Sequence, residues 1–317
     1  MHASLCVAGI DAGQRFLDLA LAPAGQTLRQ PNTPEGIAHL LSRLAASGVT
    51  RVVLEAVGSY SQPLVLALVE AGHSVGIVNP RRIKAFREAE GRRAKTDRLD
   101  AQLIARFALV MSEAVHPIPD AAAQSLRALS TRRRQLTSMA AMAKTRLKQA
   151  LDPLVIDSHK ATIAALDAAC RTVEATISAR IAAEPARAAQ RALLRTVPGI
   201  GERVSALLIT DLPELGQRDR KTIASLAGLA PHVSQSGNAP PRAAISGGRP
   251  CVRAALYMSA LVAVRHDPAF RAAYAALRAQ GKPAKLALVA VARRVLVTAN
   301  AVLKTKTPYK PQITLDP

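Results

Sequence analysis

Two carboxylates three residues apart mark the stretch of this chain best suited to chemistry. Asp97 and Asp100 follow a basic segment, 91–95, and an apolar pattern of helical spacing continues to Phe107. Residues three apart share one face of a helix, so the two carboxylates should project together. They repel each other unless a cation lies between them, and Mg²⁺ prefers carboxylate oxygens. Alternatively, Thr96 or Asp97 simply caps the helix.

Two further acids stand at the ends of apolar runs that read as buried strands. Asp11 follows the run 4–10, and Glu55 follows the β-branched run 51–54. These acids can converge with Asp97 and Asp100 from a later helix. The ribonuclease-H-like fold uses such an arrangement to hold two metal ions roughly 4 Å apart on a phosphodiester. Asp11 alone could equally be a turn residue, whereas a purely structural role explains Glu55 less well.

The elements around these acids indicate an α/β domain. Alternation and turn signals predict strands at 4–10, 15–22, 26–30, 51–54 and 74–78, and helices at 33–46, at 62–70, after Asn79-Pro80 and from Asp97. This order of three strands, helix, strand, helix, strand and helix predicts a mixed sheet. Residues 112–120 contain two prolines and read as a linker.

The rest of the chain reads as mainly helical. Residues 121–184 are Ala-rich and basic, and Pro153 divides them into two long helices. This pair could be a solvated structural element, a dimer arm or an RNA-contacting surface. The turn 197–201 resembles a helix-hairpin-helix hairpin, whose glycines let backbone amides approach a phosphate. A polar loop at 232–250 precedes helices at 252–265, 268–279 and 283–304.

Composition points to a polyanionic partner. The 317 residues carry 43 Lys and Arg against 22 Asp and Glu, a net charge of +21. Such an excess favours nucleic acid. Aromatic residues make up only 3%, so contacts should run from Arg and Lys to phosphate rather than through base stacking. No apolar run predicts a membrane span, no signal peptide is recognisable, and the three scattered cysteines lack zinc spacing.

In this order and spacing, the motifs resemble the insertion-sequence transposases of the one-hundred-and-ten family over nearly the whole chain. The resemblance is carried by Gly9-Ile10-Asp11, Leu54-Glu55-Ala56, Asn79-Pro80, Lys95-Thr96-Asp97 with Asp100-Ala101, Val197 to Gly201, Gly228-Leu229 with Pro231, Ser236-Gly237, Ile245 to Arg249, and Arg253 with Leu256 to Met258. The predicted organisation is a RuvC-like domain of ribonuclease H fold at 1–115, a helical coiled-coil region at 116–190, a mostly α serine transposase domain with the helix-hairpin-helix element at 191–304, and an irregular tail at 305–317.

The resemblance implies a DNA recombinase that excises and inserts its element under the guidance of a structured bridge RNA. The family's metal-binding acids fall on Asp11, Glu55, Asp97 and Asp100, which would bind Mg²⁺ or Mn²⁺, and its serine nucleophile falls on Ser236. The implied partners are donor and target DNA, the guide RNA, and further copies of the chain in a dimer or tetramer with composite active sites. The expected location is the bacterial cytoplasm, at the nucleoid and away from membranes.

The implied chemistry is coherent. A serine hydroxyl is a weak nucleophile until it is activated, and a phosphodiester resists attack until cations neutralise its oxygens. Ser236 would store the cleaved bond as a phosphoserine ester, so strand exchange would need no ATP. Two alternatives compete: a hydrolytic RuvC-like nuclease or resolvase in which water is the nucleophile, and a non-catalytic nucleic-acid scaffold in which the acids are caps and turn residues.

Overall fold

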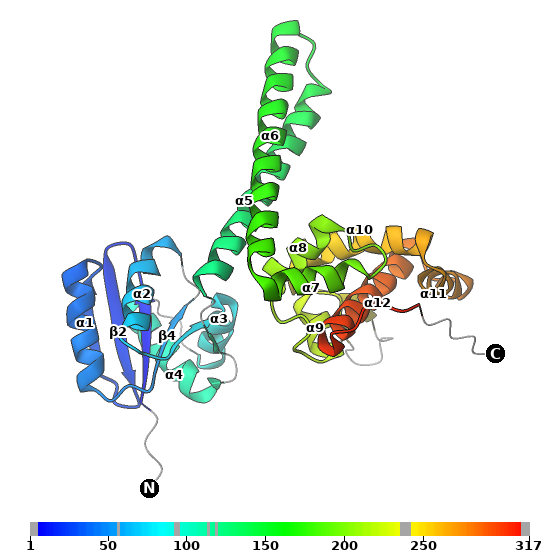
Figure 1. Cartoon of the computed structure of the whole chain (residues 1–317). Helices are drawn as coiled ribbons and strands as arrows, with labels where there is room; N and C mark the ends of the chain where they lie inside the picture. Colours follow the sequence, from blue (N-terminus) through cyan, green and yellow to red (C-terminus); the bar gives the residue numbers. More distant parts are fainter. Residues whose placement is uncertain are drawn as a thin grey trace. The chain divides into compact units, whose positions relative to one another are not determined.

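The computed structural model of the protein describes residues 6–55, 58–91, 96–112, 115–117, 120–234 and 242–311. The chain divides into two compact units, Met1–Asp120 and Ala121–Pro317 (Figure 1). The first is an α/β unit and the second is mostly helical, as the sequence predicts.

A mixed sheet forms the centre of the first unit. Its strands are β1 (Val7–Ala12), β2 (Phe16–Ala22), β3 (Thr27–Pro31), β4 (Arg51–Glu55), β5 (Val75–Val78) and β6 (His116–Pro117), in the order β3-β2-β1-β4-β5-β6. Strands β1, β4 and β5 are parallel, and the other pairings are antiparallel. Strand β6 lies within the stretch 112–120, for which the sequence indicated only a linker. It pairs with the edge of β5, so this stretch completes the sheet.

Helices cover both faces of the sheet. One face carries α1 (Pro34–Ala46) and α2 (Gln62–Glu70), which follows a short 3₁₀ turn, η1 (Ser59–Ser61); the other carries α3 (Pro80–Ala89) and α4 (Asp97–Val110). Alternate residues of β1 divide between the two faces. Ile10 packs in the core with α1 and α2, whereas Val7 packs in the core with α3 and α4.

Helix α4 lies directly on the backbone of β1. A Cβ atom at Gly9 would lie 2.3 Å from the backbone nitrogen of Ala105 and 2.5 Å from the carbonyl oxygen of Ala101. Ala20 of β2 is buried against the same two alanines. Small residues on both elements therefore allow an approach that any larger side chain at position 9 would block.

The second unit begins with a long helical hairpin, α5 (Ala121–Leu147) and α6 (Pro153–Ala183), which lie side by side (Figure 1). A bundle follows, made of α7 (Pro185–Arg195), α8 (Glu202–Asp211), α9 (Arg220–Leu226), α10 (Pro250–His266), α11 (Pro268–Ala279) and α12 (Ala284–Thr305). Two short antiparallel strands, β7 (Pro231–Ser234) and β8 (Arg242–Ile245), interrupt it. The sequence predicted a polar loop here without strands, because pairing of such short segments is a tertiary event.

The turn between α7 and α8 packs on α10. Gly199 has φ +84°, and a Cβ atom there would lie 2.2 Å from the carbonyl oxygen of Ser259. Glu202, at the first position of α8, bonds to Arg191 and accepts a hydrogen bond of 3.2 Å from Ser178. Close helix packing therefore accounts for Gly199, and the Glu202 carboxylate at the start of α8 is bound by Arg191 and Ser178.

Helix α12 is the one described helix that is long and apolar enough to cross a membrane, with a hydropathy of 1.8. The sequence reading found no such segment, because Arg293 and Arg294 interrupt the run. Val291, Val295 and Ala299 of α12 are buried in the core of the second unit. Its apolar character is therefore that of a core helix.

The chain after α12 has no regular structure as far as residue 311, as expected, but it is anchored. The Tyr309 backbone N–H donates to Thr196 Oγ1 at 2.9 Å, and its hydroxyl donates to Asp267 Oδ2 at 3.1 Å. Its ring stacks on Phe270 with centroids 6.2 Å apart.

The close packing of α4 on β1 makes Gly9→Ala a strongly destabilising change. We expect it to lower the free energy of unfolding by roughly 2–4 kcal/mol, because backbone atoms on both sides cannot move aside. Gly58→Ala is the matched control, since a Cβ atom there meets nothing within 4 Å and φ is −92°. Urea unfolding of the full chain measures both; equal, small effects would contradict the packing argument.

Candidate active site

Three carboxylates form a row across neighbouring strands of the first unit. Asp18 of β2 is the register partner of Asp11 in β1. Ile10 pairs with Leu54, so Asp11 and Glu55 are the next residues on parallel strands. Asp11 is two residues from Gly9 and Glu55 is two from Val53, both of which face α3 and α4. The row therefore lies on the face that α4 covers.

The first turn of α4 adds two more carboxylates to this row. Thr96 caps the helix, and its hydroxyl accepts a hydrogen bond of 3.3 Å from the Leu99 backbone N–H. Asp97 and Asp100 both lie in the turn that follows, Asp97 exposed and Asp100 only 6% exposed. The structure thus brings together the four acids that the sequence predicts for this unit. The helix cap at Thr96 and the pair of acids, Asp97 and Asp100, are both present, so the two interpretations of this stretch do not exclude each other.

Asp11 is the acid of this cluster whose pKa is clearly raised. Burial, as the largest cause, and then the neighbouring charges of Asp100, Asp97, Glu55 and Asp18 together raise the pKa of its carboxyl from 3.8 to about 6. Carboxylates this close favour either a proton or a cation among them. A pKa shift with these causes is typical of a functional site.

Two arginines bind carboxylates of the cluster. Arg87 of α3 donates to Asp100 Oδ1 at 2.5 Å, and both side chains are largely buried. Arg29 of β3 donates from Nε and NH2 to Asp18, with its shortest contact 2.8 Å, and from the same NH2 to Asp97 Oδ2 at 2.9 Å. A cavity of about 560 Å³ lies beside these groups, lined by Asp18, Thr27, Leu28, Arg29, Thr96, Asp97 and Arg98.

The donor set fits a hard divalent cation by its chemistry, because it consists of carboxylate oxygens whose mutual repulsion a cation would relieve. Across the described ranges, no three acid, histidine or thiol side chains are arranged to hold an ion as they stand. Asp97 and Asp100 point their oxygens at Arg29 and Arg87 instead. Metal binding would therefore require these side chains to exchange partners.

Sequence reasoning missed Asp18 and Arg29. Asp18 had a local signal: it is an acid inside the otherwise apolar strand Phe16–Ala22, and a charge in such a place is rarely buried without a partner. Arg29 had no local sequence signal, because its contacts depend on the register of β2 and β3 and on the position of α4.

The predicted nucleophile, Ser236, lies outside the described residues, in the segment that joins β7 to β8. The residues just before β7 and just after β8 are in close contact. A Cβ atom at Gly248 would lie 2.1 Å from the Gly228 backbone nitrogen. Arg253 of α10 donates to the carbonyl oxygens of both ends, at 3.3 Å to Gly228 and 2.9 Å to Gly247. These glycines and Arg253 therefore fix the base of the serine-bearing segment.

Arg249, in the same motif, has a structural partner. Its guanidinium makes two hydrogen bonds of 2.6 Å to the two carboxylate oxygens of Glu214. This two-point contact engages two of the five N–H donors of the guanidinium. Arg249 therefore contributes to the base of the hairpin through its ion pair with Glu214.

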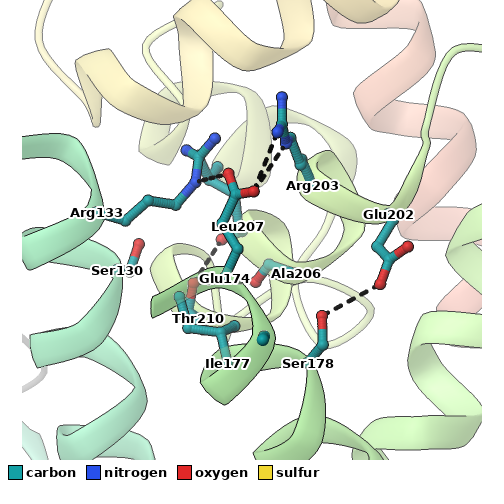
Figure 2. A pocket seen from close by; sticks show the side chains of 11 residues that line it. Ser130, Arg133, Glu174, Ile177, Ser178, Glu202, Arg203, Ala206, Leu207 and Thr210 are labelled. Carbon is teal, nitrogen blue, oxygen red and sulfur yellow. Dashed lines mark hydrogen bonds and ion pairs between the residues drawn. The ribbon is translucent and has the colours of Figure 1, made fainter. Parts of the chain in front are cut away.

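A second cavity, of about 400 Å³, lies between α5, α6 and α8 (Figure 2). Its arginines do not make an anion site. Arg133 donates to Glu174 Oε1 at 2.6 Å, and Arg203 donates to Glu174 Oε2 at 3.0 Å. One carboxylate thus binds both guanidinium groups, and Figure 2 shows it between them. These ion pairs join the helical hairpin to α8.

Curated relatives resemble the chain over nearly its full length. A pilin gene-inverting protein of Moraxella bovis is 27% identical over 315 residues, which cover 96% of this chain and 98% of the relative, and that of Moraxella lacunata gives the same values. An IS110 insertion-element protein of 43.6 kDa from Streptomyces coelicolor is 31% identical over 168 residues, half of this chain and 38% of that protein.

Among solved structures, Thermus thermophilus RuvC in complex with a Holliday junction substrate matches 36% of this chain and all of its own length. The identity is 20% and the TM-score 0.29, too low to support an argument. Two family models match this sequence directly. Residues 8–156 match the DEDD model of IS110 transposases, described as a transposase, and residues 191–275 match the transposase model of the IS116/IS110/IS902 family. Together they span most of the chain, which belongs to the IS110 family of transposases and is therefore a DNA recombinase.

Proposed function

We propose that this transposase breaks and rejoins DNA through a covalent serine–DNA intermediate, uses Mg²⁺ or Mn²⁺, and is guided by a structured bridge RNA. The single observation that carries the proposal is the convergence of Asp11, Glu55, Asp97 and Asp100, two from strand ends and two from the first turn of α4. A structural role as caps and turns would not require four acids to share one place against their own repulsion.

The acids would hold the divalent cation, since their oxygens are the ligands such an ion prefers. When bound, it would neutralise phosphate charge and so favour attack at phosphorus. The order of strands in the mixed sheet, with acids at the ends of β1 and β4, supports a RuvC-like fold of the ribonuclease H type for the first domain. Arg29 and Arg87 would keep the cluster neutralised while no cation is bound.

The strand transfer would take place on Ser236. Its Oγ would form a bond to phosphorus, the bond from phosphorus to one DNA oxygen would break, and that oxygen would take up a proton while the serine loses one. A DNA hydroxyl of another strand would then reverse the step. The clamped base of the hairpin, formed by Gly228, Gly248 and Arg253, supports a role for this segment in presenting a nucleophile.

We propose donor DNA, target DNA and the guide RNA as partners, in line with the net charge of +21. We further propose a homo-oligomer in which the acids of one subunit serve the serine of another, acting on the bacterial nucleoid. The relatives from Moraxella are gene-inverting proteins by name, and inversion rejoins every end that it cuts. This favours a recombinase over a hydrolytic nuclease.

Removing any of the four acids should abolish cleavage and preserve binding. We expect Asp11→Ala, Glu55→Ala, Asp97→Ala and Asp100→Ala each to lower the cleavage rate by more than about a hundredfold, because metal-dependent phosphoryl chemistry would be lost. Nucleic-acid affinity should change little, since phosphate contacts come from Arg and Lys. Glu35→Ala, an exposed acid in the first turn of α1, is the control. Full cleavage in EDTA, or by all four variants, would rule out the metal site.

Ser236→Ala should lose both the protein–DNA adduct and recombination. The assay incubates protein, guide RNA and labelled DNA with Mg²⁺, denatures the mixture and separates the adduct from free DNA. Ser246→Ala, just after β8, is the matched control, and Ser234→Ala, at the last residue of β7, is a second; both should keep the adduct. Wild-type protein that releases cleaved DNA with free ends, and never forms an adduct, would identify water as the nucleophile.

The raised pKa of Asp11 should make the metal-free protein less stable above pH 6. Its carboxyl ionises near pH 3.8 in the unfolded chain and near 6 in the folded one. Between these values the folded state binds the extra proton, so stability falls as the pH rises and then levels off. Asp11→Asn should therefore gain more in Tm over wild type at pH 7.5 than at pH 5. A gain that is the same at both pH values would contradict the assignment.

A further inference from the structure

Arg29 joins one buried and one exposed carboxylate at the edge of the acid cluster. Its Nε donates to both Asp18 oxygens, at 3.0 and 3.1 Å, and its NH2 donates to Asp18 Oδ2 at 2.8 Å. The same NH2 donates to Asp97 Oδ2 at 2.9 Å. The guanidinium thus holds a carboxylate of the sheet and a carboxylate of α4 at once.

The two contacts of Arg29 differ in strength. The Asp18 side chain is 5% exposed, so breaking its ion pair would leave a buried charge without its partner. The Asp97 side chain is 67% exposed and that of Arg29 is 50% exposed, which makes their ion pair a weak one. Arg29 should therefore remain on Asp18 while it gives up Asp97 readily.

A cation and a guanidinium compete for the same carboxylate of Asp97. We propose that Arg29, anchored by Asp18, is a positioning residue that holds Asp97 in the metal-free protein and is displaced from it when a divalent cation binds. This inference rests on the proposed metal site. Asp100 differs, because its partner Arg87 is 18% exposed and Asp100 itself 9% exposed by side chain, so that pair is held much more firmly.

This competition should lower the affinity of the site for a divalent cation. The cation must break one exposed ion pair before it gains Asp97, and it then lies near a positive charge that stays anchored on Asp18. Removal of the guanidinium should therefore strengthen metal binding, although it takes away contacts of the folded protein. A residue that only supported the fold would have the opposite effect or none.

The test is a Mn²⁺ titration of the full-length protein without nucleic acid, in which the electron paramagnetic resonance signal of free Mn²⁺ reports binding. We expect Arg29→Gln to bind Mn²⁺ roughly two- to fivefold more tightly than wild type, the factor that one exposed ion pair supplies. The double variant Asp18→Asn/Arg29→Gln, which leaves no buried charge behind, should show the same gain. Circular dichroism confirms that each variant is folded.

Arg15→Gln is the matched control. Arg15 is exposed, and its guanidinium lies 5.8 Å from the ring centre of Phe16, over which Arg29 also lies at 5.2 Å. The Arg15→Gln substitution, like Arg29→Gln, removes one positive charge from this edge of the sheet, and it should leave Mn²⁺ affinity unchanged. An equal gain in Arg15→Gln would mean that net charge alone is responsible, which would overturn the proposal.

The remaining outcomes separate this inference from the proposed function. A gain in Arg29→Gln that disappears in the double variant would mean that the freed Asp18 binds the ion, and would overturn the role given to Arg29. Wild-type binding that Asp11→Ala abolishes, with unchanged affinity in Arg29→Gln, would contradict only the inference. No Mn²⁺ binding by wild type would contradict the metal site and the inference together.

Discussion

Helix α4 can reach the acids of the sheet only because its backbone lies directly on the backbone of β1. Gly9 leaves no side chain between them, and Ala101 and Ala105 present only methyl groups on the facing side of the helix. A side chain at position 9 would lift the helix away by the thickness of a methyl group or more. The first turn of α4 would then move away from Asp11. Packing of small residues thus decides where the charges lie.

The approach that gathers the acids also creates their repulsion. Five carboxylates, with Asp18 included, share one region, and burial together with the charges of the four neighbours raises the pKa of Asp11. Arg29 and Arg87 offset part of it by binding three of the five. Guanidinium groups therefore balance part of the cluster's charge in the structure, and a divalent cation at the proposed metal site would be another way to balance it.

Much of this unit could be predicted from local patterns. The strands around Asp11 and Glu55 and the helix that begins at Asp97 followed from apolar periodicity and caps, which depend on neighbouring residues. Strand β6 and the β7–β8 pair did not, since these short segments lack the apolar run that indicated β5 and are defined by their partners. The Arg29 contacts to Asp18 and Asp97 span 11 and 68 residues of sequence. Only the register and the packing of α4 bring those groups together.

A glycine motif alone does not identify the group that packs against the glycine backbone. At Gly199 the sequence suggested a phosphate, yet the atom in close contact is the carbonyl oxygen of Ser259 in α10. At Gly248 the close partner is the backbone of Gly228, and at Gly228 the close partners are the Arg253 guanidinium and the Gly247 carbonyl oxygen, which hold the base of the segment that carries Ser236. A missing side chain has the same sequence signature whether the neighbour is a ligand or a helix. The neighbour must be found in three dimensions, and in these cases it belongs to the protein.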